Sequence, residues 1–359
     1  MSSDSNIIGQ VKQNVSQGLQ WLLSRGQRQN VPQLITREVP HEGSSSFGNP
    51  KFLLGTKTGL LYFDGQKLWQ LFEGRVYGIT RYEERWYTTW NHQITLGNKP
   101  LGSMASVLSF RFQDGMITDL RVEVAPLDEE LHQIDAWDDH LYITDTANNR
   151  ILEYKIGKKS LQYIASHYPN GRIEDGRSSS NYSHINSVFR CGEYIYVMYH
   201  NLTKKTDRYS QVALLNRDWS VIDIVDTEAN SAHNVFFHDQ KIIFCDSMNG
   251  RLMKGDKVLV DVDTYMRGLA ASPEFWLLGG SDHAKREERG FTDGSVYQYS
   301  PKMDEVISTM RIPNCGSLYE VRLIDPEDLA ISSTSNYNWN QGQSTNGRSS
   351  KRGRHQQSR

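Results

Sequence analysis

Short apolar segments alternate with turn residues from about residue 50 to residue 335, and no helical period persists there. Two examples are GLLYFDGQKLWQLF at 59–72 and HLYITDTANNRILEYKIG at 140–157. Short apolar and aromatic runs bounded by Gly, Asn and Asp are typical of β-strands. Many such strands in succession predict an all-β domain, which is a sandwich, a barrel or a propeller.

One unit of four strands recurs along this region. Its clearest copies are LHQIDAWDDHLYITDTANNRILEYKIGKKSLQYIA at 131–165 and AHNVFFHDQKIIFCDSMNGRLMKGDKVLVDV at 232–262. A unit of four strands and about 50 residues is typical of a propeller blade. Six units predict a six-bladed β-propeller. The equivalent positions at the start of each first strand are Tyr77, His132, His184, His233, Arg267 and Tyr319.

The two ends of the repeat region complement each other. The last unit has two clear strands, YEVRLI at 319–324 and DLAIS at 328–332, whereas GLLYFDG and QKLWQLF at 59–72 lack an inner strand. We expect strands from both ends to complete one blade, which removes free sheet edges. KFLLGT at 51–56 is left over as a possible additional strand, so the count is open by one blade.

The chain therefore divides into four parts. Residues 1–30 have apolar positions every three to four residues, which predicts an amphipathic helix. It either packs on the main domain or docks on a partner protein or a membrane surface. Residues 31–49 are a linker and 50–335 the propeller. Residues 336–359 are rich in Ser, Asn, Gln and Arg and contain no acid, which predicts a disordered basic tail.

The stretch LYITDTANNRILEY at 141–154 resembles a blade of the NHL-repeat and SMP-30 or gluconolactonase-like six-bladed propellers. In those blades an Asp closes the second strand before a polar turn. Calcium-binding members of this superfamily use Glu and Asn or Asp on the axis. This chain has mainly His at the comparable positions, so the resemblance does not extend to calcium.

Composition excludes several function classes. The 359 residues carry a net charge of −2, so no specific nucleic-acid binding is expected. The apolar runs are too short to cross a bilayer, and the N-terminus lacks the pattern of a secretory signal. Cys191, Cys245 and Cys315 are unevenly spaced, which fits free thiols and a cytoplasmic protein. Motifs of serine hydrolases, P-loop NTPases, zincins and Rossmann enzymes are absent.

Three histidines occupy equivalent positions of the repeat. Because a hairpin fixes which residues oppose each other, each histidine is expected to face a polar residue at the end of the second strand. The expected pairs are His132 with Asp145, His184 with Tyr199 and His233 with Asp246. Metal-bound histidines commonly donate their other N–H to such a partner, and the same pairing orients a general base.

Two interpretations of the histidines remain open. They are either one structural residue duplicated with the blade, or three ligands that converge on Zn²⁺, Fe²⁺ or Mn²⁺. In the second case Asp145, Asp246 and Tyr199 support the site, and Arg267 binds an anionic group unless it pairs with Glu320. Long loops are expected on the same face, from Asn91, His167, His200 and Ser281.

Two functions follow from these alternatives. The first is a metal-dependent hydrolase, lyase or isomerase for a small anionic substrate, with an Fe²⁺ oxygenase as a further possibility. The second is a non-catalytic scaffold that binds a protein or peptide through its long loops. A propeller fold supports both roles and does not decide between them.

Overall fold

The computed structural model describes residues 31–43, 47–96, 99–128, 130–173, 176–285, 287–325 and 327–332. The side chains of 94–102 and of residue 204 lie outside this description. The predicted N-terminal helix and the predicted basic tail also lie outside the described residues.

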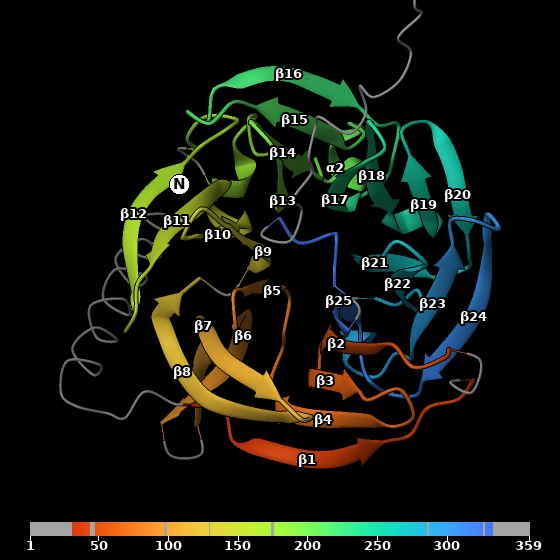
Figure 1. Ribbon diagram of the computed structural model, residues 1–359. Helices are drawn as coiled ribbons and strands as arrows, with labels where there is room; N and C mark the ends of the chain where they lie inside the picture. Colours follow the sequence, from red (N-terminus) through yellow and green to blue (C-terminus); the bar gives the residue numbers. More distant parts are fainter. Residues whose placement is uncertain are drawn as a thin grey trace, which may run out of the picture.

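The described strands form six antiparallel sheets around a central axis (Figure 1). Blade 1 consists of β5 (Ile79–Tyr82), β6 (Arg85–Leu96), β7 (Lys99–Gln113) and β8 (Met116–Leu127). Blade 2 consists of β9 (Leu131–Trp137), β10 (His140–Asp145), β11 (Arg150–Ile156) and β12 (Leu161–His167). Blade 3 consists of β13 (Ile185–Cys191), β14 (Tyr194–Tyr199), β15 (Gln211–Leu215) and β16 (Val221–Asp226).

Blade 4 consists of β17 (His233–His238), β18 (Lys241–Asp246), β19 (Arg251–Lys254) and β20 (Lys257–Asp261). Blade 5 consists of β21 (Tyr265–Ala271), β22 (Trp276–Ser281), β23 (Gly294–Ser300) and β24 (Glu305–Ile312). The sixth sheet has the order β1-β4-β3-β2-β25. Its strands are β1 (Leu34–Val39), β2 (Lys51–Thr56), β3 (Gly59–Phe63), β4 (Leu68–Glu73) and β25 (Leu318–Asp325). The protein is a six-bladed β-propeller.

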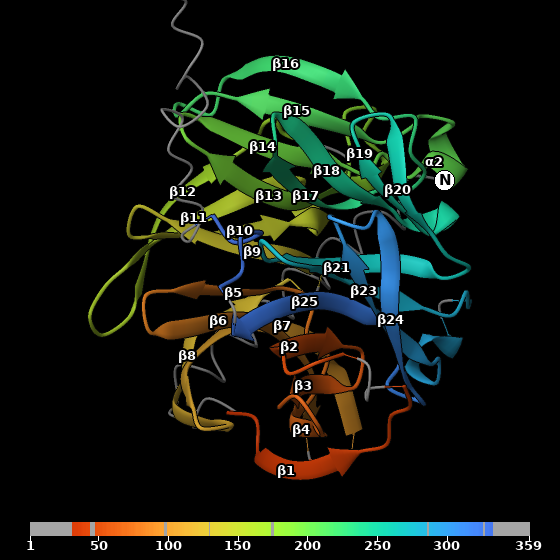
Figure 2. The same ribbon diagram turned by 45° about the vertical axis from the view of Figure 1, so that its right-hand side comes forward.

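Strands from both ends of the propeller region close the sixth blade, as the sequence predicts. Figure 2 shows β25 alongside β2, and the two strands pair in antiparallel register. The left-over segment KFLLGT is β2, so it belongs to this blade and does not add a seventh. The expectation that 328–332 forms a strand was wrong, because those residues adopt a turn. Within 31–49, the predicted linker, Leu34–Val39 forms the outermost strand.

The sequence expectation of a long loop from Asn91 was also wrong. Residues 91–96 continue β6 and residues 99–106 begin β7, so the two strands extend one hairpin beyond the blade. The polar and Gly residues of this segment suggest a loop, yet its backbone stays paired from Arg85–Arg111 to Leu96–Lys99.

Apolar side chains fill the space between neighbouring blades. The Phe236 ring of β17 meets the Phe189 ring of β13 edge-on at 5.6 Å, and the Trp276 ring of β22 at 5.9 Å. Edge-to-face aromatic pairs at such distances add to the stabilisation that burial provides. This packing between blades leaves their inner strands free to line the axis.

Residues 328–332 close one end of the axis. The Asp328 carboxylate accepts hydrogen bonds from the backbone N–H groups of Ala271, Leu323 and Ala330. The Ser332 hydroxyl bonds the Asp135 carboxylate of blade 2. Figure 1 shows this blue segment passing across the centre of the ring. Asp135 lies four residues beyond Leu131 along β9, so the closed end is opposite to the end where the inner strands begin.

Among the described residues, no helix has the length and apolar character needed to cross a membrane.

Candidate functional site

A cavity of about 850 Å³ opens at the end of the axis where the inner strands begin. Residues from every blade contribute to its wall. The six equivalent positions of the repeat all line it: Tyr77, His132, His184, His233, Arg267 and Tyr319. The repeat and the closed ring together account for this convergence, because each blade brings the same strand position to the axis.

The predicted pairing of the histidines was wrong by one residue. Asp145 pairs with Leu131, Tyr199 with Ile185 and Cys245 with His233. In all three hairpins the register shifts near the start of the inner strand, because a β-bulge places one extra residue there. In blades 2 and 4, extrapolating the register from the turn end of the hairpin could not detect this extra residue. In blade 3 the expected register was already wrong at the turn, since Phe189 pairs with Tyr196 and Cys191 with Tyr194.

The predicted supporting residues Asp145, Asp246 and Tyr199 do not line the cavity. The Asp145 carboxylate accepts hydrogen bonds from the Asn148 amide and from Nε of Arg150 at 2.7 Å. The Asp246 carboxylate accepts from the backbone N–H of Asn230 and from the Asn249 amide, both at 2.8 Å. Both carboxylates therefore fix the turns after the second strands rather than the histidines.

The residue after each of these aspartates bonds the histidine instead. Oγ1 of Thr146 lies 2.9 Å from Nδ1 of His132 and donates its own proton to the Ile185 carbonyl at 2.5 Å. Because that hydroxyl proton is already used, the contact makes Nδ1–H of His132 the donor. In its neutral form His132 then presents the unprotonated Nε2.

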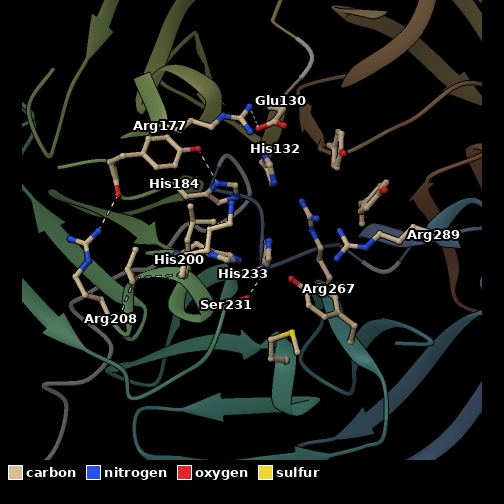
Figure 3. A pocket seen from close by; sticks show the side chains of 18 of the residues that line it. Glu130, His132, Arg177, His184, His200, Arg208, Ser231, His233, Arg267 and Arg289 are labelled. Carbon is tan, nitrogen blue, oxygen red and sulfur yellow. Dashed lines mark hydrogen bonds and ion pairs between the residues drawn. The ribbon is translucent and has the colours of Figure 1, made fainter. Parts of the chain in front are cut away.

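His233 has the same arrangement. Its Nδ1 lies 2.9 Å from the carbonyl oxygen of Ser231, which only accepts, and 2.9 Å from Oγ of Ser247. Nδ1 of His233 therefore carries the proton, and Nε2 carries the lone pair. Figure 3 shows one ring nitrogen of His233 directed at Ser231 and the other directed into the opening.

His184 is held by a tyrosine from its own loop. The Tyr182 hydroxyl lies 3.0 Å from Nδ1 of His184, and either group is able to donate in this contact. His184 adopts φ of 53°, a left-handed conformation that is uncommon outside glycine. The backbone at this position thus departs from an ordinary strand start and turns the ring toward the axis.

Sequence reasoning missed a fourth histidine. His200 follows β14, is 8% exposed and lines the same cavity. Its position in blade 3 is equivalent to Thr146 in blade 2 and Ser247 in blade 4, since each follows the last residue of the second strand. The repeat does carry a signal for it, because His200, Thr146 and Ser247 each come directly after the second strand of their blade.

The four imidazole rings are near neighbours. Ring centroids are separated by 5.2 Å for His132 and His184, 6.1 Å for His132 and His233, 4.6 Å for His184 and His200, and 5.2 Å for His200 and His233. Burial lowers the pKa of all four imidazoles, and the positive charge of Arg267 lowers the pKa of His132, His200 and His233 further. The pKa of His200 is about 3. At neutral pH the four rings are therefore uncharged.

The other half of the wall is aromatic and cationic. The Arg267 guanidinium lies 4.8 Å from the ring centroid of Tyr319 and 5.3 Å from that of Tyr77, and the two tyrosine rings are 4.3 Å apart. Arg267 is 8% exposed. Glu320, its possible partner from the sequence, instead bonds Arg322 at 3.1 Å and the Asn234 amide at 3.2 Å.

Arg267 therefore has no carboxylate partner. Its guanidinium makes no hydrogen bond or ion pair with any described residue and contacts the faces of the two tyrosines. Its charge still acts on Glu320 from beyond ion-pair distance, where it opposes the rise in pKa that burial causes. Of the lining residues, Glu130 supplies the carboxylate, and it pairs with Arg177. The other basic side chains on the wall are Lys57, Arg75, Lys205, Arg208 and Arg289. The cavity is consequently electropositive, and Figure 3 shows Arg267 and Arg289 directed into it.

The long loops of the histidine face form the sides of the cavity. Ser178, Ser179 and Ser180 line it from the loop between blades 2 and 3, and Leu202 and Thr206 line it from the segment around α2 (Thr203–Thr206). These loops therefore contribute to the wall of the cavity.

The nitrogen atoms that line the cavity meet only some of the requirements of a metal site. His132 and His233 present unprotonated Nε2 atoms, as histidine ligands require. As the side chains stand, however, the described residues contain no group of three or more His, Cys, Asp or Glu placed to hold a metal ion. The positive charge of Arg267 also opposes a cation beside these rings.

Comparison with known proteins supports the fold and leaves the function open. No family model and no curated protein matches the chain. A chain of a nidogen–laminin complex structure is similar with a TM-score of 0.52 and 10% identity, over 79% of this chain and 98% of that chain. A likeness at this identity speaks for the propeller fold alone.

Two further solved structures are more distant. A putative 6-phosphogluconolactonase of Bacteroides fragilis aligns with a TM-score of 0.46 and 10% identity, over 78% of this chain and 99% of that chain. Virginiamycin B lyase of Staphylococcus aureus aligns with a TM-score of 0.39 and 14% identity, over 63% of this chain and 67% of that chain. The function is therefore argued from the site itself.

Proposed function

We propose that this propeller is an enzyme that binds a small anionic molecule in its axial cavity and acts on it as a hydrolase, lyase or isomerase. The observation that carries the proposal is Arg267, a buried guanidinium with no carboxylate partner. A buried charge without a partner costs several kcal/mol, so such a residue is usually kept for a ligand. A planar guanidinium matches a carboxylate or a phosphate through two parallel hydrogen bonds.

The histidines supply the groups for chemistry beside that anchor. Neutral His132 and His233 present lone pairs on Nε2, and each ring is fixed through Nδ1 by the protein. A general base must be unprotonated at the working pH and held within reach of the proton that it removes. Both conditions favour His132 and His233 as the bases, with the substrate placed by Arg267.

A divalent metal is an alternative use of the same Nε2 lone pairs, because a ring that binds a metal through Nε2 cannot also take up a proton there. His132, His184 and His233 would hold it through Nε2, and it would supply a Lewis acid or an activated water. The size of the cavity favours an enzyme over the alternative scaffold, because about 850 Å³ suits a small molecule and the long loops line this pocket.

Anion titration and metal analysis test the two parts independently. Isothermal titration of the full chain with oxalate and with inorganic phosphate should detect binding to the wild type, and Arg267→Met should abolish it. Binding that is unchanged in Arg267→Met would refute the anchor. Metal analysis after loading with Zn²⁺, Fe²⁺ or Mn²⁺ should find a stoichiometric ion that is lost in His132→Ala, His184→Ala and His233→Ala. Wild-type protein without metal at saturation would exclude the metal.

A further inference from the structure

His200 differs from the other histidines in the way that its ring is fixed. Two consecutive residues after it, Asn201 and Leu202, adopt left-handed backbone conformations with φ of 58° and 53°. Such conformations cost about 1–3 kcal/mol each for residues other than glycine, and they persist only where the surrounding structure enforces them. Here the backbone N–H of Asn201 bonds the Ser183 carbonyl at 2.9 Å, and Oγ1 of Thr206 bonds the Asn201 carbonyl at 2.6 Å.

The strained turn folds the chain back onto the imidazole. The backbone N–H of Leu202 donates to Nδ1 of His200 at 3.1 Å. A backbone amide nitrogen has a proton to give and no lone pair to offer, so Nδ1 of His200 must be the acceptor. In the neutral ring the proton is then on Nε2, the opposite tautomer to that of His132 and His233.

The position of His200 places this proton in the cavity. Its ring centroid lies 4.6 Å from that of His184 and 5.2 Å from that of His233. Figure 3 shows the ring on the same side of the opening as His233, facing the space that Arg267 enters.

We infer that His200 is a further substrate-binding residue, which donates a hydrogen bond from Nε2–H to an oxygen of the anion held by Arg267. This inference rests on the proposed function. Because the backbone sets the tautomer before the ligand arrives, the donor needs no reorganisation, and it stabilises negative charge that builds on that oxygen during turnover. The same tautomer excludes His200 from a metal site, since its Nε2 has no free lone pair.

Nitrogen-15 NMR of histidine-labelled full-length protein tests the tautomer directly. At pH 7, long-range proton–nitrogen correlation should show protonated Nε2 and unprotonated Nδ1 for His200, and the reverse for His132 and His233. The histidine signals are assigned by their loss in His200→Gln, His132→Gln and His233→Gln. The tautomers themselves are measured on the wild-type protein. A proton on Nδ1 of His200, or a charged ring, overturns the inference.

Oxalate titration then tests the contact. Adding oxalate should shift the Nε2–H resonance of His200. Removing a hydrogen bond to a charged group should weaken oxalate binding about tenfold to hundredfold in His200→Leu. His200→Gln keeps an N–H near the same place and should stay within about threefold of the wild type. His238→Gln, the same change at a half-buried histidine outside the cavity wall, is the matched control.

The outcomes separate the two claims. Oxalate binding that depends on Arg267 but is equal in His200→Leu and the wild type overturns the donor role and leaves the proposed function standing. Absence of oxalate and phosphate binding in the wild type overturns both. A shifted His200 resonance with impaired binding in His200→Leu and retained binding in His200→Gln supports the inference.

Discussion

Replacing Arg267 by methionine should stabilise the unliganded protein and destroy anion binding. Burying an unpaired ion costs several kcal/mol, whereas the contacts of Arg267 with the two tyrosine faces return about 0.5–2 kcal/mol each. Methionine fills a similar volume without the charge and keeps apolar contact with the rings. We therefore expect a gain of about 1–3 kcal/mol in the free energy of unfolding.

The loss of affinity follows from the same geometry. Truncating one partner of a buried, hydrogen-bonded charge pair costs about 2–5 kcal/mol of binding free energy. At 1.4 kcal/mol per factor of ten, this corresponds to a loss of about 30-fold to several thousand-fold. The two effects thus have opposite signs, which a residue kept only for structure would not show.

Two assays measure these effects on one preparation. Urea unfolding followed by tryptophan fluorescence gives the free energy of unfolding, and isothermal titration with oxalate gives the affinity. Arg251→Met is the matched control, because Arg251 pairs with Asp261 outside the cavity at 2.9 Å and its side chain is 42% exposed. Destabilisation of Arg267→Met by more than about 1 kcal/mol with unchanged oxalate affinity would refute this account.

Three further predictions follow. Burial lowers the pKa of His132, His184 and His233, so the unfolded chain binds more protons below about pH 6.5 and the free energy of unfolding should fall on acidification. Burial raises the pKa of Glu320 to about 7, which opposes this fall between pH 7 and 4.5. Glu320→Gln should therefore steepen the fall measured by urea unfolding, and an unchanged slope would contradict this prediction. Ser332→Ala removes a hydrogen-bond donor from the buried Asp135 carboxylate and should lower the free energy of unfolding by about 1–3 kcal/mol in the same assay. A loss below about 0.5 kcal/mol would show that residues 328–332 do not hold the axis closed. Thr146→Val removes the acceptor of His132 Nδ1–H and should mix the two tautomers of His132 in nitrogen-15 spectra, and an unaltered tautomer would show that another group sets it.

The fold was predictable because its signal repeats. Six copies of a strand pattern gave the blade count and brought Tyr77, His132, His184, His233, Arg267 and Tyr319 to one column, and all six line the cavity. Closure by both ends followed from blades that were incomplete at each end. The roles of two short apolar segments were the reverse of the expected ones: KFLLGT is a strand of the sixth blade, and DLAIS forms a turn. Only the pairing of β2 with β25 across the closed ring distinguishes them.

The details of the site depended on features that a pattern does not carry. A single extra residue moved His132 away from Asp145 and His233 away from Asp246, and a bulge changes no residue type. His184 missed Tyr199 because the turn of that hairpin also has another register than expected. His200 was missed because it comes from the second strand of its blade. Its tautomer depends on the left-handed turn at Asn201 and Leu202. Such turns are usually predicted from a glycine, and this one has none.

A crystal structure of the full-length protein with oxalate tests the central claim most directly. We predict electron density for the anion in the axial cavity, with two oxygens on the Arg267 guanidinium and another oxygen within hydrogen-bond distance of Nε2 of His200. An empty cavity at an oxalate concentration that saturates binding in solution, or Arg267 turned onto a carboxylate of the protein, would contradict the account.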